Sequence, residues 1–379
     1  MDSLTGTGKL ARLVLRRDRL LMPLWVVFLG IVPLSYVASI KALFPTAAGR
    51  QGYATASAAN AGFVALYGRL FGSSVGELVA WRAGFLPVVV GLFSILTVIR
   101  HTRTDEDTGR RELLNATVVG RHAGLAAALA ATFAADLVLG ALLAVGMIGQ
   151  GLPAAGSLAF GAQLTVVGWV FAAVGGVAAQ LTSGAGSARG IAITTLGVAY
   201  LCRVVGDISG MSAGPLSWLS WLSPIGWAQR IQPYGGNHWW PAALSIGCTA
   251  LLTIASVALS ARRDVGAGLL PPRLGRPVAT PGLRSPLALA WRLHRGLLAG
   301  WTAGFAVLGL VLGYLAAGIG DLVRDNHQIA DVFARLGGAT GLIDSYLAAT
   351  LGLLGLVAAA YAIQATLRMR DEEAAGRAE

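Results

Sequence analysis

The chain has 379 residues, of which 55% are hydrophobic and 12% are charged, and its mean hydropathy is +0.66. So few polar residues do not cover a water-soluble globule of this size, and the composition therefore indicates a membrane protein. The formal net charge of +11 does not predict binding to nucleic acid, because the basic residues lie between apolar segments. Cys202 and Cys248 lie inside apolar segments and predict neither a disulfide framework nor a metal site.

The N-terminal segment, residues 4–19, predicts an amphipathic helix on the inner membrane surface. Leu10 and Leu13 can share one side of such a helix, and Arg12 is one of several basic residues that supply its charge. A plain basic flank is the alternative. The apolar run that follows, residues 20–40, is about twice as long as the core of a signal peptide, so we expect an uncleaved first span.

Eight apolar segments are long enough to cross a bilayer, which takes about 20 mostly apolar residues in a helix. They are residues 20–40, 83–99, 123–147, 157–181, 189–206, 239–260, 298–319 and 347–367. Backbone groups in lipid must satisfy their own hydrogen bonds, so all eight are predicted to be helices. Most of the 29 Lys and Arg residues lie on one side if the N-terminus is cytoplasmic, which predicts a multi-pass protein of the plasma membrane in that orientation.

Two long segments are then external, residues 42–82 and residues 207–238. Half of the ten tryptophans lie between Trp218 and Trp240, in the second segment and directly after it. Tryptophan rings concentrate at the boundary between membrane and water, so this segment is expected to lie in the outer interface or to re-enter the membrane. An ordinary loop with anchoring aromatic residues is the alternative.

The most charged stretch of the chain occurs twice. It reads RTDEDTGRRE from Arg103 to Glu112 and RDEEAAGRAE from Arg370 to Glu379, and each copy directly follows a long apolar segment. A repeat of this kind determines the architecture. It predicts an all-α integral membrane protein with two parallel six-span repeats, of which about eight spans are present.

The predicted domains follow from this repeat. Residues 1–262 form the first six-span repeat, with a charged cytoplasmic helix at 103–119. Residues 263–284 contain four prolines and form a cytoplasmic linker, because proline interrupts a helix. Residues 285–379 form an incomplete second repeat with two spans and the start of a second charged helix. A second amphipathic helix is expected before its first span, at Pro286–Arg295.

The repeated charged helix is a candidate contact for a soluble partner, because it is short, polar and joined directly to membrane spans. A solvated loop with helix caps is the alternative for a single copy, but two copies in matching positions favour the contact. Gly109 would allow either a tight turn or the close approach of another backbone. The candidate residues are Asp105, Glu106, Gly109, Arg110 and Glu112 in the first copy and Glu373, Gly376, Arg377 and Glu379 in the second.

These motifs resemble the membrane subunit of type-2 ATP-binding-cassette exporters, and in particular the two-repeat permeases of actinobacterial polyketide-antibiotic and multidrug exporters. The resemblance covers the whole chain. It rests on the two Glu-x-x-Gly-Arg-x-Glu motifs, on Leu222-Ser223-Pro224-Ile225-Gly226-Trp227-Ala228-Gln229, and on Tyr234 with Trp239-Trp240-Pro241. It implies that 103–119 is the coupling helix that contacts a nucleotide-binding ATPase subunit, and that the exported compound is a lipophilic small molecule.

One departure from the family pattern concerns length. Members of this family have two complete halves and twelve spans, whereas this sequence stops at Glu379, the counterpart of Glu112. We therefore expect the second repeat to be truncated, with four spans absent.

The chain itself is predicted not to be an enzyme and to hold no cofactor or metal. Its only superficial phosphate-loop match, Gly6 to Leu10, lacks the first glycine and has leucine where Ser or Thr should bind magnesium. ATP and Mg²⁺ are therefore expected on the partner subunit. No Ser-His-Asp set or carboxylate pair in the apolar spans supports catalysis.

Ionisable and amide groups within the spans are candidates for the substrate path, because such groups are costly in a membrane. Asp136 lies in the middle of the third span and is the main candidate, with Gln163 and Gln180 as weaker ones. A structural role is the alternative for Asp136, by pairing with Arg203 or by capping Thr132. Amides also serve as hydrogen-bonding contacts between helices.

The main rival function is a secondary transporter of the major-facilitator type, driven by an ion gradient. Such carriers also have two parallel six-span halves, and Asp107-x-Gly109-Arg110-Arg111 resembles their charged loop. However, those carriers have a short turn between the first two spans, where this chain has the long segment 42–82.

Overall fold

The computed structural model describes residues 3–115, 118–264, 266–270, 278, 285–325 and 351–367, the last without 353 and 356. The chain divides into two compact units. The first unit runs to Arg273 without residues 60–62, and the second contains those three residues and everything from Leu274 onward. Each unit is described by itself.

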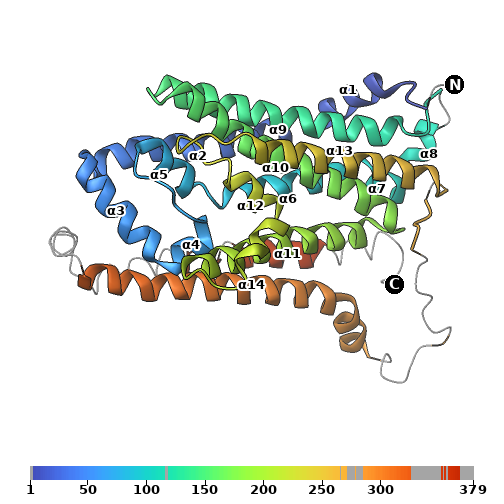
Figure 1. Cartoon of the computed structure of the whole chain (residues 1–379). Coiled ribbons are helices and arrows are strands. Elements are labelled where there is room, and N and C mark those ends of the chain that lie inside the picture. Colours follow the sequence, from blue (N-terminus) through green and yellow to red (C-terminus); the bar gives the residue numbers. More distant parts are fainter. Residues whose placement is uncertain are drawn as a thin grey trace. The chain divides into compact units, whose positions relative to one another are not determined.

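Every regular element in the described part of the chain is a helix, which confirms the predicted all-α class. The helices of the first unit are α1 (Thr7–Arg17), α2 (Leu21–Leu43), α3 (Ala47–Ala59), α4 (Ala61–Tyr67), α5 (Val75–Arg82), α6 (Leu86–His101), α7 (Arg103–Asp107), α8 (Arg110–Asn115), α9 (Ala123–Gly149), α10 (Ala154–Leu181), α11 (Ala185–Met211), the 3₁₀ helix η1 (Ser217–Leu222), α12 (Pro224–Gln229) and α13 (Trp240–Ala261) (Figure 1).

Six of the described helices are long and apolar enough to cross a membrane. They are Leu21–Leu43, Leu86–Asp107, Ala123–Gly149, Ala154–Leu181, Ala185–Met211 and Trp240–Ala261. These six coincide with the first six spans predicted from the sequence. The seventh predicted span falls inside a longer helix of the second unit, and the eighth lies partly outside the described residues, so eight spans and the two-repeat architecture stay predictions.

Helix α10 is the centre of the first unit. It packs against α6, α9, α11 and α13, and these helices run side by side with it in Figure 1. In its most apolar stretch 78% of the residues are buried, whereas the corresponding share is 22% in α13. An apolar helix that is covered on every side is a core helix, whereas α13, like α2 with 39%, leaves most of its surface to face lipid.

Small residues allow the close approach of α9 and α10. A Cβ atom on Gly140 would lie 2.6 Å from the carbonyl oxygen of Gly161, and one on Gly161 would lie 2.3 Å from the carbonyl oxygen of Gly140. Helices in membranes associate through such contacts, because lipid supplies no hydrophobic force that drives helices together.

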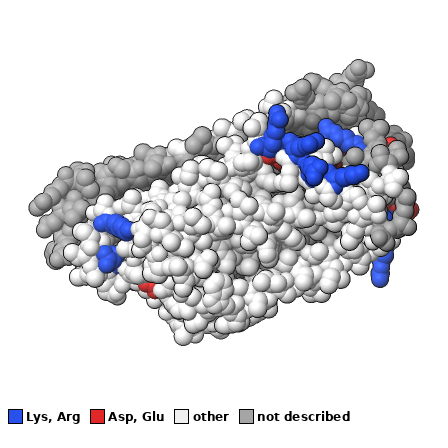
Figure 2. Space-filling model, turned by 90° about the horizontal axis from the view of Figure 1, so that it is seen from above, with Lys and Arg blue, Asp and Glu red and all other residues white. Residues whose placement is uncertain are grey.

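Charged side chains concentrate at the ends of the first unit. In Figure 2 most of the basic residues of the visible face gather at one end, with others at the opposite end and a broad uncharged surface between them. We call the end that holds α1, α7 and α8 the basic end, and the end that holds α5, η1 and α12 the tryptophan end. An uncharged belt between two charged ends is the surface that a bilayer requires.

Helix α1 only partly matches its predicted role as an interfacial helix. It spans eleven residues rather than the expected sixteen, and it packs against α9. Val14 is buried there, whereas Leu13 and Leu15 stay exposed. Leu13 and Leu15 are two residues apart and do not share a face of the helix, so they leave apolar side chains on either side of the buried Val14.

The second unit contains α14 (Pro286–Asp325), a single helix of 40 residues. It joins the predicted amphipathic segment Pro286–Arg295 to the predicted seventh span. A shorter apolar helix, Val357–Leu367, contacts it through a hydrogen bond of 2.9 Å from Trp301 Nε1 to Gln364 Oε1. Most of the linker 263–284 and the second charged motif lie outside the described residues.

Replacing Gly161 by alanine should destabilise the first unit. The added methyl group would collide with the backbone of α9, and overpacking of this kind costs about 1–3 kcal/mol. We expect Gly161→Ala to lower the midpoint of thermal unfolding in detergent by several degrees. The matched control is Gly197→Ala in α11, where a Cβ atom would meet nothing within 4 Å. Equal midpoints for the two variants would contradict the close packing of α9 on α10.

Candidate functional site

The charged motif folds into two short helices directly after the second span. Helix α7 continues from α6 after Thr102, and α8 follows a turn at Gly109. Gly109 has a φ of +70° and no atom within 4 Å of the position of a Cβ. Of the two roles considered for this glycine, the structure therefore selects the tight turn, because a left-handed backbone suits glycine and nothing packs on it.

Glu106 is the centre of a buried ion cluster. Its side chain is 1% exposed, and its Oε1 atom lies 2.6 Å from Arg111 Nη1 and 2.8 Å from Arg263 Nη2. Arg103 also pairs with it from one turn earlier in α7. Burial lowers the pKa of Arg111, against the effect of the Glu106 carboxylate. A buried carboxylate is tolerated only when it is paired in this way.

The cluster also anchors the chain that follows the sixth span. Arg103 Nη2 donates to the carbonyl oxygen of Ala267 at 2.9 Å, and Arg263 Nη1 donates to the same oxygen at 3.0 Å. Leu269 N and Leu270 N donate to the carbonyl oxygens of Gln180 and Leu181 at the end of α10. The start of the predicted linker is therefore attached to α7 and α10.

Gln180, one of the residues predicted for the substrate path, belongs to this same cluster. Its Oε1 atom accepts a hydrogen bond of 2.7 Å from Arg263 Nε, and its Nε2 atom donates to the carbonyl oxygen of Gly176. Both ends of the amide are thus used to hold the protein together.

Helix α7 connects further elements at the basic end. Asp105 accepts a hydrogen bond of 2.7 Å from Arg17 in α1, and this bond raises the pKa of Arg17. Asp107 accepts one of 2.6 Å from the backbone N–H of Ala185, at the start of α11. A carboxylate at a helix N-terminus is favoured by the helix dipole.

The predicted contact residues therefore fall into two groups. Asp105 and Glu106 face inward and are bound to arginines, whereas Gly109, Arg110 and Glu112 lie on the outside. The side chain of Arg110 is 58% exposed and only approaches Asp105, at 3.5 Å. The matching residues of the second copy, Glu373, Gly376, Arg377 and Glu379, lie outside the described residues.

Asp136 is fully enclosed between spans. Ser94 Oγ in α6 donates a hydrogen bond of 2.9 Å to its Oδ1 atom, and Gly168 in α10 leaves the room for its carboxyl group. Neither partner expected from the sequence is used, because Thr132 bonds the carbonyl oxygen of Ala128 and Arg203 bonds that of Val64. The Oδ2 atom of Asp136 has no hydrogen-bond partner among the described residues.

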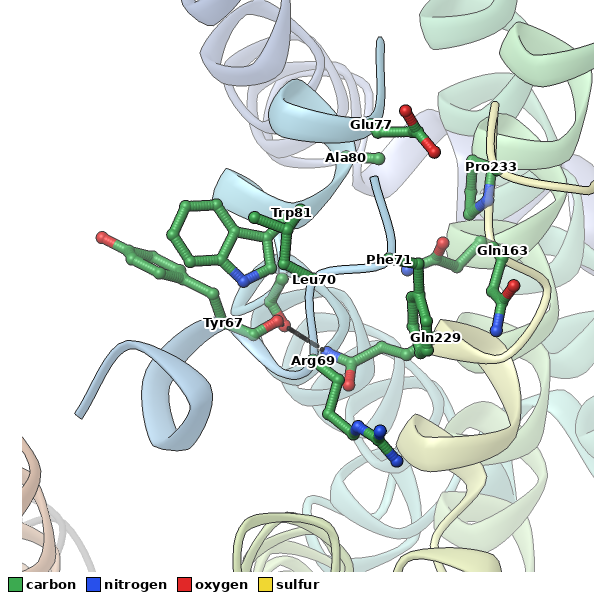
Figure 3. A pocket seen from close by; sticks show the side chains of 13 residues that line it. Tyr67, Arg69, Leu70, Phe71, Glu77, Ala80, Trp81, Gln163, Gln229 and Pro233 are labelled. Carbon is green, nitrogen blue, oxygen red and sulfur yellow. Dashed lines mark hydrogen bonds between the residues drawn. The ribbon is translucent and has the colours of Figure 1, made fainter. Parts of the chain in front are cut away.

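Gln163 lies in a cavity at the tryptophan end, shown in Figure 3. The cavity has about 390 Å³ of empty space, part of it open to the surroundings, and its other lining residues include Arg69, Phe71, Glu77 and Gln229. Gln163 is 3% exposed, and its Oε1 atom has no hydrogen-bond partner in the described part of the chain. Of the residues predicted for the substrate path, Gln163 is the one that lines this cavity.

Sequence reasoning missed the role of Gln229, which closes this end of the unit. Its Nε2 atom donates to the carbonyl oxygens of Tyr67 and Gly84, each at 3.1 Å (Figure 3). One of these carbonyls is at the end of α4 and the other is just before the start of α6. The amide of Gln229 therefore supplies hydrogen bonds to two carbonyl oxygens that lie at helix ends, where the helix itself provides no donor. The sequence motif around Pro224 could have indicated this role, because Pro224 begins the short helix α12 and Gln229 is the last residue of that helix.

The segment 207–238 is consequently not an ordinary loop. Ser223 caps α12 by accepting a hydrogen bond from Gly226 N, and Ile225, Ala228 and Ile231 are fully buried. Helix α12 packs against α10, α11 and α13. Of the two readings of this segment, the packing favours the one in which it re-enters between the spans.

Comparison with known proteins gives two matches. The multidrug efflux system permease protein Rv1217c of Mycobacterium tuberculosis is 44% identical over 377 residues, which cover 99% of this chain and 68% of that protein. A family model described as the C-terminal domain of the multidrug efflux system permease Rv1217c matches residues 283–379.

Replacing Glu106 by glutamine should destabilise the protein, because three arginines would lose their common counter-charge. Removing one partner of a buried pair costs about 3–5 kcal/mol. We expect Glu106→Gln to lower the thermal unfolding midpoint strongly and to expose residues 263–270 to proteolysis. Glu112→Gln, an exposed carboxylate of α8, is the control and should behave as the unaltered chain. A Glu106→Gln protein as stable as the control would mean that the cluster contributes little.

Proposed function

Because the chain belongs to the family of multidrug efflux system permeases that includes Rv1217c, we propose that it is the membrane subunit of an ATP-driven exporter of lipophilic compounds. It is a multi-pass membrane protein of an efflux system. In the proposed arrangement a separate ATPase subunit binds ATP and Mg²⁺. The N-terminus and the basic end face the cytoplasm, in the plasma membrane, where that subunit docks.

The observation that carries the proposal is the division of the charged motif into a fixed half and an exposed half. Glu106 joins the second span to the residues after the sixth span, and Asp105 joins it to α1. The half-buried Gly109 and the exposed Arg110 and Glu112 follow immediately. A force applied to α8 by a docked subunit would therefore reach several spans, which is what a coupling helix requires.

The proposed architecture is two parallel six-span repeats with a coupling helix in each. Two features support it. The charged motif recurs at Arg370–Glu379, and the matching family model, described as a C-terminal domain, covers residues 283–379. That start agrees with the second repeat predicted to begin at 285. By this proposal Glu373, Gly376, Arg377 and Glu379 form the second docking site.

For the cargo, we propose a lipophilic molecule that leaves along an apolar path between the spans. Two polar groups are available to it. Gln163 lines the cavity at the tryptophan end, and Asp136 lies deeper, with one carboxylate oxygen unsatisfied among the described residues. A buried polar atom without a partner is costly, so a ligand that supplies a donor would be favoured there.

The experiment that tests this function is co-purification. The chain, expressed together with a candidate ATPase subunit, should retain that ATPase when it is purified through a tag at the permease N-terminus. Drug accumulation in cells that express both should be lower than in cells that express either one, and should not respond to collapse of the proton gradient alone. Export that needs no ATPase and stops when the proton gradient collapses would instead indicate a secondary transporter.

Reversing the charge of Arg110 should uncouple the two subunits. Like charges at a docking surface cost several kcal/mol, so Arg110→Glu is expected to reduce export at least about tenfold while the chain still inserts and folds. Lys41→Gln removes a charge in the last turn of the first span, keeps a donor for the carbonyl oxygen of Gln150, and should export normally. Wild-type export by Arg110→Glu would show that α8 is only a solvated turn.

A further inference from the structure

A second cavity adjoins the one that contains Gln163. It encloses about 690 Å³ of empty space, part of it open to the surroundings. Its lining residues are Arg69, Phe71, Asp207, Trp221, Gly226, Gln229, Arg230, Gln232, His238 and Trp240. Arg69, Phe71, Gln229 and Gln232 line both cavities, so the two are parts of one hollow at the tryptophan end.

Positive charge exceeds negative charge in the second cavity. Arg69 and Arg230 line it together with a single acidic residue, Asp207, whose carboxylate already lies 3.9 Å from the fully buried Arg203. Glu77 lines only the first cavity. Arg69 makes no hydrogen bond or ion pair with any described residue, and Arg230 donates only to the carbonyl oxygen of Gly226, at 3.3 Å. Two guanidinium groups therefore have donors to spare, and guanidinium is suited to carboxylate and phosphate groups.

Aromatic rings form the rest of the wall. The guanidinium of Arg230 lies 4.1 Å from the centroid of the Trp221 ring, and Trp221 stacks on Trp240 at 5.4 Å. Arg69 lies 5.9 Å from the ring of Phe71. Trp221 and Trp240 stay 40% and 57% exposed. An apolar surface thus continues from the cations toward the start of α13, at the level where tryptophans meet lipid.

The inner end of the hollow has an unsatisfied polar group. The Oε1 atom of Gln163 is buried without a partner among the described residues, which is a strong reason to expect a ligand or water beside it. The other acidic residue in reach, Glu77, is already used, because its Oε2 atom accepts a hydrogen bond of 2.9 Å from Ser74 N in the cap of α5. Its carboxylate therefore adds one negative charge on the side of the hollow away from Arg230.

We propose that this hollow is a binding site for an anionic amphiphile. The carboxylate or phosphate group binds between Arg69 and Arg230, and the apolar body lies on Trp221 and Trp240. Such a ligand is either an acidic membrane lipid or a free acidic compound, since both present the same chemistry. The site is a property of this chain alone and does not depend on the proposed ATPase.

The test is photo-crosslinking of the full 379-residue chain in phosphatidylcholine vesicles without nucleotide. The probe is a long-chain fatty acid with a diazirine in its chain, and its methyl ester is the uncharged control. Peptide mapping should find saturable labelling by the acid on the peptides that contain Phe71, Trp221 and Trp240, with the ester labelling them about tenfold less. A hydrogen bond to a charged group is strong enough for that ratio.

Substitutions decide whether the arginines are responsible. Arg69→Gln with Arg230→Gln should reduce labelling by the acid about tenfold or more and leave the ester unchanged. Arg69→Gln alone should give part of that loss, and it is the safer variant because Arg69 is exposed and makes no hydrogen bond or ion pair with a described residue. Lys41→Gln, a basic residue that lines neither cavity, should label as the unaltered chain.

Competition identifies the source of the ligand. If phosphatidylglycerol in the vesicles displaces the acid probe, the site takes a lipid headgroup, and if it does not, the site takes free amphiphiles. Equal labelling by acid and ester, or full labelling of the arginine variants, would overturn the proposal.

Discussion

The pairing of Glu106 with three arginines is the interaction on which the basic end depends. A carboxylate as buried as that of Glu106 would be costly to ionise without a positively charged partner. Its partners come from the second span, from α8 and from the residue after the sixth span, so their common attachment fixes where each of those elements ends. The membrane spans have much apolar surface, but apolar contacts do not by themselves fix one position of a helix against its neighbour. The ion pairs of the cluster require particular distances between particular atoms, and so they do.

The opposite end depends largely on hydrogen bonds between neutral groups. Gln229 satisfies two carbonyl oxygens at breaks between helices, and Tyr234 bonds Ser157 while its ring lies where a side chain on Gly156 or Gly76 would be. Arg203 is buried there against Asp207, but Arg69 and Arg230 keep donors that can bind something else. The two ends thus differ in chemistry as well as in position.

The six spans could be predicted from the sequence because each is specified by its own length and hydrophobicity. Segments such as 123–147 needed no partner to be recognised, and the structure changes their ends by a few residues only. The partners of polar groups could not be predicted, since they depend on which faces meet. Asp136 bonds Ser94 and not Arg203, and Gln180 bonds Arg263, which stands 83 residues away. The repeated motif indicated that 103–112 matters, but not that half of it is buried.

The separation of Arg263 from Glu106 also has a consequence for synthesis. Arg103 and Arg111 lie within five residues of Glu106, so they can neutralise it as soon as the second span leaves the ribosome, whereas Arg263 stands 157 residues later. The nascent chain therefore carries a provisional version of the cluster through the insertion of four more spans. Arg263 completes it only after all six spans of the first unit have been synthesised.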